Sequence, residues 1–204
     1  MARSPAKNKT PSQIAWSIYL DSVHNYAHAE SIFTPEECEK IVRISKKYEM
    51  FPGITISNDP EIRSIRKVKT AALDAVELRW VFERLTGIIV SMNEQFFEFD
   101  IWGLGEGINF LEYENIGDKY DSHIDKIYGS LVRKLTVIVQ LTDPKKYTGC
   151  DLEVVYCGDN GKVTMTREQG SVIVFPSYVV HQVTPLKKGK RHSLVSWVSG
   201  KPFK

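Results

Sequence analysis

Residues 170–200 read GSVIVFPSYVVHQVTPLKKGKRHSLVSWVSG, and this stretch does most to decide the fold. It contains three short runs, at 171–175, 179–185 and 191–199, whose β-branched and aromatic residues are typical of strands. The segments FPS and LKKGK between the runs are turn signals. The stretch therefore predicts three short strands of an antiparallel β domain.

The strand pattern extends back to about residue 99. Further turn signals, DPKKYTG and GDNG, separate runs of the same kind. These runs predict strands near 105–114, 131–142, 151–157 and 162–167. An additional early strand is expected at 14–23, IAWSIYLDSV, because of its β-branched and aromatic content.

Two helices are expected before this strand-rich half. In FTPEECEKIVRISKKY, Thr34 is the expected N-cap, Pro35 the first helical residue and Glu37 the second partner of a capping box. A second helix is expected from Asp74 to about Phe96. Both carry apolar residues at helical spacing, which we interpret as core positions: Ile41, Val42 and Ile44 in the first, and Leu78, Val81, Leu85, Ile88, Ile89 and Met92 in the second.

These elements predict a mainly β protein, a β-sandwich or jelly roll, with its helices packed on one outer sheet face. We expect a flexible tail at 1–13 and a single domain at 14–204. Within that domain, a helical support region spans about 34–98 and the β core about 99–200.

Composition restricts the function classes. The 204 residues are 42% hydrophobic and 25% charged with a net charge of +2, which is typical of a globular protein and gives no sign of nucleic-acid or membrane binding. No apolar run approaches the roughly 18 residues that a membrane span needs, and no apolar segment of a signal peptide follows the basic start. The three cysteines, Cys38, Cys150 and Cys157, lack CxxC spacing, which favours a reducing compartment, the cytoplasm, over a disulfide framework.

One histidine and one aspartate stand out in YDSHIDKIYG at 120–129. His123 and Asp125 are two positions apart, so in extended backbone both side chains face the same side. His181, with a turn before and after it, is the candidate third ligand of a metal. Two histidines and one carboxylate form the facial triad that binds Fe(II) and leaves positions open. The alternative is that His123 belongs to an ordinary solvated loop.

Arg191 opens the last strand, ten residues after His181. Its planar cation can hold a carboxylate with two hydrogen bonds, and strand alternation puts Ser193 and Trp197 on the same face. The alternative is that Arg191 continues the basic turn KKGK. We prefer the binding role, because a charge at the start of an apolar strand needs a partner if it is buried.

His123, Asp125, His181 and Arg191, in this order on a late β domain, resemble the Fe(II)- and 2-oxoglutarate-dependent dioxygenases. Within that superfamily the chain is similar to the prolyl 4-hydroxylase-like group, especially the bacterial and phage PKHD-type hydroxylases. The matching segments are EYENIGDKYDSHID, RKLTVIVQLTDPKKYTGCDLEV and residues 170–200, and more loosely IRSIRKVKTAAL and MNEQFFEFDIWGL.

The resemblance implies a double-stranded β-helix, the jelly-roll form expected above, and it assigns roles. Tyr113 and Tyr120 match two active-site tyrosines of the family, and Gln140 stands where relatives carry a tyrosine that helps to hold the distal carboxylate. An amide there can substitute as a donor. Cys150, in GCDL where relatives have GGEL, is expected to be a small buried residue and not a ligand.

The resemblance also implies the reaction. Fe(II), 2-oxoglutarate and O2 would be used, with ascorbate as a candidate reductant, and a C–H bond would be hydroxylated with succinate and CO2 as co-products. The implied substrate is a prolyl residue of a peptide or protein, although a small molecule is the alternative. Segments 58–73 and 126–131 would form the rim of the barrel mouth through which the substrate enters. Arg66, Tyr120 and Trp197 are candidate substrate contacts. A bacterial or phage source would place the protein in the cytoplasm, of the host if viral.

Two hypotheses from other classes stay open. A cupin-like metal-binding protein would use the same triad without activating oxygen and would leave Arg191 without a role. A non-catalytic binding module would keep the fold alone and tolerate His123→Ala. A nucleic-acid dealkylase of the same superfamily is disfavoured, because the charge is near neutral and no basic stripe with interleaved aromatic residues is present.

Overall fold

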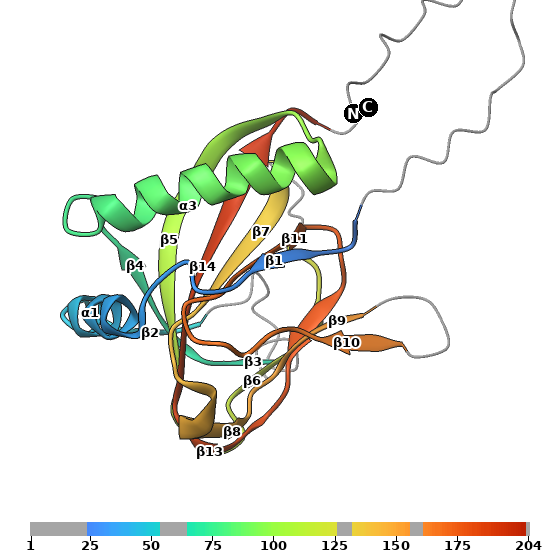
Figure 1. Cartoon of the computed structure of the whole chain (residues 1–204). Helices are drawn as coiled ribbons and strands as arrows, with labels where there is room; N and C mark the ends of the chain where they lie inside the picture. The colour runs from blue at the N-terminus through green and yellow to red at the C-terminus, as the bar shows by residue number, and fades with distance from the viewer. Residues whose placement is uncertain (1–23, 54–64, 126–131, 156–160, 203–204) are drawn as a thin grey trace, which may run out of the picture.

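The computed structural model describes residues 24–53, 65–125, 132–155 and 161–202. Two sheets face each other in a jelly roll, as the strand pattern predicts (Figure 1). The larger has seven strands, in the order β1 (Ala27–Ala29), β11 (Val172–Pro176), β7 (Arg133–Gln140), β14 (Arg191–Gly200), β5 (Ile101–Tyr113), β4 (Lys69–Leu73) and β2 (Phe51–Pro52). The smaller has five, in the order β10 (Lys162–Thr164), β9 (Leu152–Val155), β12 (His181–Val183), β6 (Lys119–His123) and β3 (Arg66–Lys67).

Two helices cover the outer face of the larger sheet. Helix α1 (Pro35–Ser45) begins with the expected capping box, in which Thr34 and Glu37 bond reciprocally. Helix α3 (Arg79–Met92) lies across the strands β5, β14 and β7 (Figure 1). Their apolar stripes join one buried cluster with the sheet, as expected for an amphipathic helix.

Alternation along the strands separates this outer cluster from an inner one between the sheets. On β14, Leu194 and Val198 pack toward the helices, whereas Val195 and Trp197 belong to the inner cluster. The same period of two places Arg191 and Ser193 on the inner face, as the sequence predicts. Thr136, Ile138 and Gln140 likewise share the inner face of β7.

The second helix begins later than the sequence suggests. Residues 75–78 form turns, because the Asp74 carboxylate accepts a hydrogen bond from the Val76 N–H and so stabilises a local turn instead of capping the helix. Arg79 starts α3, and after Met92 the chain continues as a π-helix, Asn93–Phe97. The expected apolar positions are buried, with Ile88 partly buried.

The expected turn LKKGK is wrong. Residues Leu186–Gly189 form strand β13, which pairs with β8 (Tyr147–Gly149) in a separate two-stranded sheet. The short 3-10 helix Pro144–Lys146 precedes β8. The segments DPKKYTG and LKKGK, which both look like turns, therefore pair with each other through β8 and β13. Local residue preferences do not show such long-range pairing.

Part of the expected rim is also sheet. Within 58–73, the described residues form β3, which pairs with β6, and β4, which extends the larger sheet beside β5. The remainder of that segment, the loop 126–131, the early strand at 14–23 and Cys157 lie outside the described residues.

None of the helices in the described part of the chain has the length and hydropathy that crossing a membrane requires.

Candidate metal centre and its surroundings

His123, Asp125 and His181 meet at the inner face of the smaller sheet. β6 and β12 are neighbours, and their register pairs His123 directly with His181. Asp125 follows two residues after β6, where its N–H donates to the Ser177 carbonyl at 2.9 Å. One candidate ligand atom from each residue lies within 4.8 Å of the others. The tertiary structure thus brings together the three residues that the sequence singled out.

Backbone carbonyls fix the orientation of both imidazoles. His123 Nδ1 lies 2.7 Å from the Asp121 carbonyl oxygen, and His181 Nδ1 lies 3.0 Å from that of Val179. A carbonyl oxygen only accepts hydrogen bonds, so Nδ1 carries the hydrogen in each ring and Nε2 presents a lone pair. The two Nε2 atoms lie 3.6 and 3.4 Å from the carboxylate oxygens of Asp125.

The charge states suit metal ligation. Burial, and then the neighbouring His181, lower the pKa of His123 to about 4, so its ring is neutral at neutral pH. Burial by itself would raise the pKa of Asp125, but contact with His181 and the proximity of His123 hold that pKa below its usual range. His123 therefore offers a neutral imidazole and Asp125 a carboxylate, which are the protonation states that bind a metal.

A buried hydroxyl supports Asp125, and sequence reasoning missed it. Thr136 donates from Oγ1 to Asp125 Oδ2 at 2.8 Å, and the Ser177 hydroxyl lies 3.1 Å from Thr136 Oγ1. The signal was available in part, because Thr136 is a polar residue on the inner face of a predicted strand. Its partner could be known only from the fold.

The candidate substrate residues form two stacks beside the triad. Tyr120 stacks on His123 with ring centroids 3.5 Å apart, and the Arg66 guanidinium lies 4.9 Å from the Tyr120 ring. Trp197 packs under the guanidinium of Arg133 at 3.7 Å, and the carbonyl of Asp125 accepts from Arg133. These contacts place Tyr120 and Trp197 beside the candidate metal ligands.

Arg191 is a buried cation, 1% exposed, on the inner face of β14. Its register partner is Tyr113, whose ring centroid lies 5.4 Å from the guanidinium carbon, and burial raises the pKa of Tyr113. Arg191 Nε and Nη2 donate to Gln140 Oε1 at 3.2 and 2.9 Å. Arg191 Nη1 and Ser193 Oγ are buried without a hydrogen-bond partner, and no carboxylate among the described residues pairs with Arg191.

Cys150 lies close to Arg191 and is fully buried, as expected for a small substitute. Burial raises the pKa of its thiol to about 11, even though the charge of Arg191 acts in the opposite direction. Its φ of 56° is in the left-handed region, which explains why glycine also suits this position. A protonated thiol is a poor nucleophile and a poor ligand.

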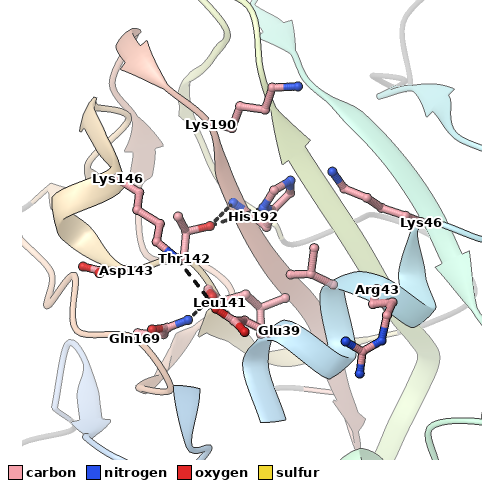
Figure 2. A pocket seen from close by; sticks show the side chains of 11 residues that line it. Glu39, Arg43, Lys46, Leu141, Thr142, Asp143, Lys146, Gln169, Lys190 and His192 are labelled. Carbon is pink, nitrogen blue, oxygen red and sulfur yellow. Dashed lines mark hydrogen bonds and ion pairs between the residues drawn. The ribbon is translucent and has the colours of Figure 1, made fainter. Parts of the chain in front are cut away.

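A large cavity, about 570 Å³, lies elsewhere (Figure 2). Helix α1 forms one wall of this cavity, and His192, the residue after Arg191, lines another part, so the cavity lies on the opposite face of β14 from the triad. His192 Nε2 lies 2.8 Å from a carboxylate oxygen of Glu112, and Lys46 pairs with that carboxylate at 3.2 Å. No local pattern in the sequence indicates this polar cluster.

Comparisons with known proteins agree with the site. Residues 108–199 match the model of the 2OG-Fe(II) oxygenase superfamily. A PKHD-type hydroxylase of Prochlorococcus marinus (strain NATL1A) is 29% identical over 70% of this chain and 62% of its own length. One of Gloeothece citriformis is 36% identical over 44% of this chain and 40% of its own length. The chain thus spans less than two thirds of these relatives.

Solved structures share the fold. A prolyl-4-hydroxylase of Pseudomonas putida superposes with a TM-score of 0.69 at 18% identity, covering 88% of this chain and 94% of that one. A prolyl hydroxylase of Trichoplax adhaerens, solved with a peptide fragment of the hypoxia inducible factor oxygen degradation domain, gives 0.71 at 18% identity, covering 86% and 84%. At this identity the likeness concerns the jelly-roll fold.

Proposed function

We propose that the chain is an Fe(II)- and 2-oxoglutarate-dependent dioxygenase that hydroxylates a prolyl residue of a peptide or protein, and the match of residues 108–199 to the 2OG-Fe(II) oxygenase superfamily supports this proposal. One observation supports this most strongly. The interior of one jelly roll contains both a cluster of two histidines with one carboxylate and a buried arginine that lacks a counter-charge among the described residues.

The residues present fit the metal. His123 and His181 would bind it through Nε2, because their Nδ1 atoms are held by carbonyls. Asp125 would bind through Oδ1, since Oδ2 already accepts from Thr136. When bound, Fe(II) with O2 supplies the oxidising chemistry that converts 2-oxoglutarate to succinate and CO2 while the substrate C–H is hydroxylated. Two imidazoles and one carboxylate are the donor set that suits non-haem Fe(II).

The residues also fit a dicarboxylate. Burying a charge without a partner is strongly unfavourable, so Arg191 is expected to take up an anion, with Ser193 as a second donor. Thr136, which supports Asp125, and Gln140, which contacts Arg191, lie on one face of β7, four residues or about 13 Å apart along the strand. A keto acid that lies between the triad and Arg191 would have one of its carboxylates held by Arg191.

The substrate assignment rests on the neighbours' chemistry. The P. putida and T. adhaerens proteins are prolyl hydroxylases, and the second was solved with a peptide. Tyr120, stacked on a metal ligand, and Arg66 beyond it would line the approach of such a peptide. We place the reaction in the cytoplasm, because the described cysteines, Cys38 and Cys150, are free thiols.

The co-substrate site can be tested without knowing the substrate. Apoprotein would be mixed anaerobically with Fe(II) and then with 2-oxoglutarate, and the visible charge-transfer band of the chelated keto acid would be recorded. We expect the band in the wild type, its loss in Asp125→Ala and its weakening in Arg191→Met. Arg43→Met, which removes an exposed cation of helix α1 beyond the far face of the sheet, is the control. Fe(II) binding without a band would favour the cupin-like alternative.

The substrate is tested by mass spectrometry. Proline-rich peptides would be incubated with Fe(II), 2-oxoglutarate, O2 and ascorbate, and paired peptides with alanine in place of proline would serve as controls. We expect the gain of one oxygen atom in the proline peptide, with a matching yield of succinate. Succinate formation that no proline peptide stimulates would contradict the prolyl assignment and leave the dioxygenase assignment intact.

A further inference from the structure

We infer that Gln140 is a positioning residue for Arg191, and that it does not itself hold the distal carboxylate of the co-substrate. The inference rests on the proposed function and deepens it. It also changes the role that the sequence suggested, in which the amide replaces a tyrosine as a donor.

The geometry of the side-chain contact carries this inference. Gln140 lies opposite Ser193 in the pairing of β7 with β14, so its side chain is diagonal to Arg191 on the same face. Its Oε1 accepts from both Nε and Nη2 of Arg191, which together form the side edge of the guanidinium. This contact occupies that edge and leaves the end edge, with Nη1, for a ligand.

The orientation of the amide follows from its second contact. Nε2 of Gln140 donates to the Thr166 carbonyl at 3.0 Å. If the amide were turned over, N–H groups would face the N–H groups of Arg191, and two carbonyl-type oxygens would face each other at Thr166. Only one orientation satisfies both neighbours, so Oε1 points to Arg191 and the amide nitrogen points away from it.

The backbone of Gln140 is fixed as well. Its N–H donates to the Ser171 carbonyl at 3.0 Å, and its carbonyl accepts from the Gly170 N–H at 2.8 Å. Gln140 is 2% exposed, so the side chain has little freedom to turn toward a ligand. We conclude that Gln140 holds the guanidinium plane before any co-substrate arrives, and that the end edge of Arg191 and the Ser193 hydroxyl receive the carboxylate.

The test compares Gln140→Met, which keeps the side-chain length but removes the acceptor, with Gln169→Met. Gln169 is a matched control, because it is partly buried and its amide also donates to a backbone carbonyl, that of Leu141. Titration of the anaerobic Fe(II) protein with 2-oxoglutarate should give a Kd raised about 10- to 100-fold in Gln140→Met, the range seen when an orienting partner is lost. Fe(II) affinity should be unchanged in both variants, and the Kd should be unchanged in Gln169→Met.

Thermal unfolding of the apoprotein separates positioning from direct contact. If Gln140 bonds Arg191 without co-substrate, the effects of Gln140→Met and Arg191→Met on Tm will not add in the double variant. Additive effects, combined with a raised Kd, would mean that Gln140 touches the carboxylate and would overturn the inference. The inference would also be overturned if the 2-oxoglutarate Kd of Gln140→Met stayed within about twofold of the wild-type value, because the expected rise is about 10- to 100-fold.

Gln140→Glu provides a second variant with the original shape. A carboxylate there would pair with Arg191 and compete with the co-substrate for its charge, so we expect the Kd again to rise at least about tenfold. An unchanged Kd in this variant would overturn the inference even if Gln140→Met does not fold. Failure of the wild type to bind 2-oxoglutarate would refute the proposed function instead, and the apoprotein cycle would still report on the contact.

Discussion

Thr136, on β7 of the larger sheet, donates its hydroxyl hydrogen at 2.8 Å to Oδ2 of Asp125, which follows β6 of the smaller sheet. The hydroxyl is fully buried and also contacts Ser177. The bond occupies Oδ2, the oxygen nearer His181, and leaves Oδ1, the oxygen nearer His123, without a hydroxyl donor among the described residues. A residue that sequence reasoning passed over therefore sets how the candidate ligand is presented.

Thr136→Val should weaken metal binding without unfolding the protein. Valine has nearly the same shape, so the inner cluster stays packed, but Asp125 loses its hydrogen bond and can rotate. We expect the Fe(II) affinity to fall about 10- to 100-fold, measured by competition with a chelator. Thr142→Val is the matched control, because the Thr142 hydroxyl is also hydrogen-bonded, as the acceptor from the His192 N–H, but lines the cavity on the far face of the sheet. Equal effects of the two variants would contradict the prediction.

Arg191→Met should weaken co-substrate binding yet spare stability. The guanidinium is buried and has no carboxylate partner among the described residues, so removing its charge relieves a desolvation penalty that offsets the lost contact with Gln140. We expect the free energy of unfolding of the apoprotein to stay within about 1 kcal/mol of the wild-type value or to rise. Chemical denaturation would measure this. A loss above about 3 kcal/mol would show that the cation is already compensated.

Acid should destabilise the protein partly through His192 and Glu112. Burial lowers the pKa of His192, despite its contact with Glu112. Burial by itself would raise the pKa of Glu112, but hydrogen bonds from His192 and Lys46 lower it overall. Because both folded-state pKa values lie below their unfolded values, the unfolded chain binds more protons, and stability present above the unfolded pKa is lost as the pH falls through each folded value.

Thermal unfolding of the wild type and of His192→Gln between pH 7.5 and 4.5 would test this, over a range set by the usual pKa values of about 6.5 for histidine and 4.3 for glutamate. We expect Tm to fall less steeply with decreasing pH in the variant. His123, whose pKa is also lowered, contributes a slope of the same sign to both proteins, so the comparison removes it. If Tm depended on pH with the same slope in the wild type and in His192→Gln, His192 would have no part in the acid destabilisation.

Thr34→Ala should remove about 1 kcal/mol of stability, the usual value of a helix N-cap. The variant loses the bond from the Glu37 N–H to Thr34 Oγ1 at the start of α1. Denaturation with urea would measure the change, and Thr34→Ser, which keeps the hydroxyl, should retain most of the stability. A loss of the same size in Thr34→Ser would point to packing of the threonine methyl group instead.

The sequence by itself determined the features that depend on local spacing. The capping box at Thr34 and the apolar stripe of α3 were expected and confirmed. The period of two along β14 placed Arg191 and Ser193 on one face without knowledge of the partner strands. These predictions succeed because a few neighbouring dihedral angles and a fixed side-chain period set the result.

Only the tertiary structure decided which distant residues meet. It joined the apparent turn at Leu186–Gly189 to β8, and it directed the Asp74 carboxylate to Val76, so that α3 begins at Arg79. It also paired Thr136 with Asp125 and turned the Gln140 amide toward Thr166, leaving its oxygen to Arg191. Such contacts join strands far apart in sequence, and their energies depend on burial and on partners that no local pattern contains.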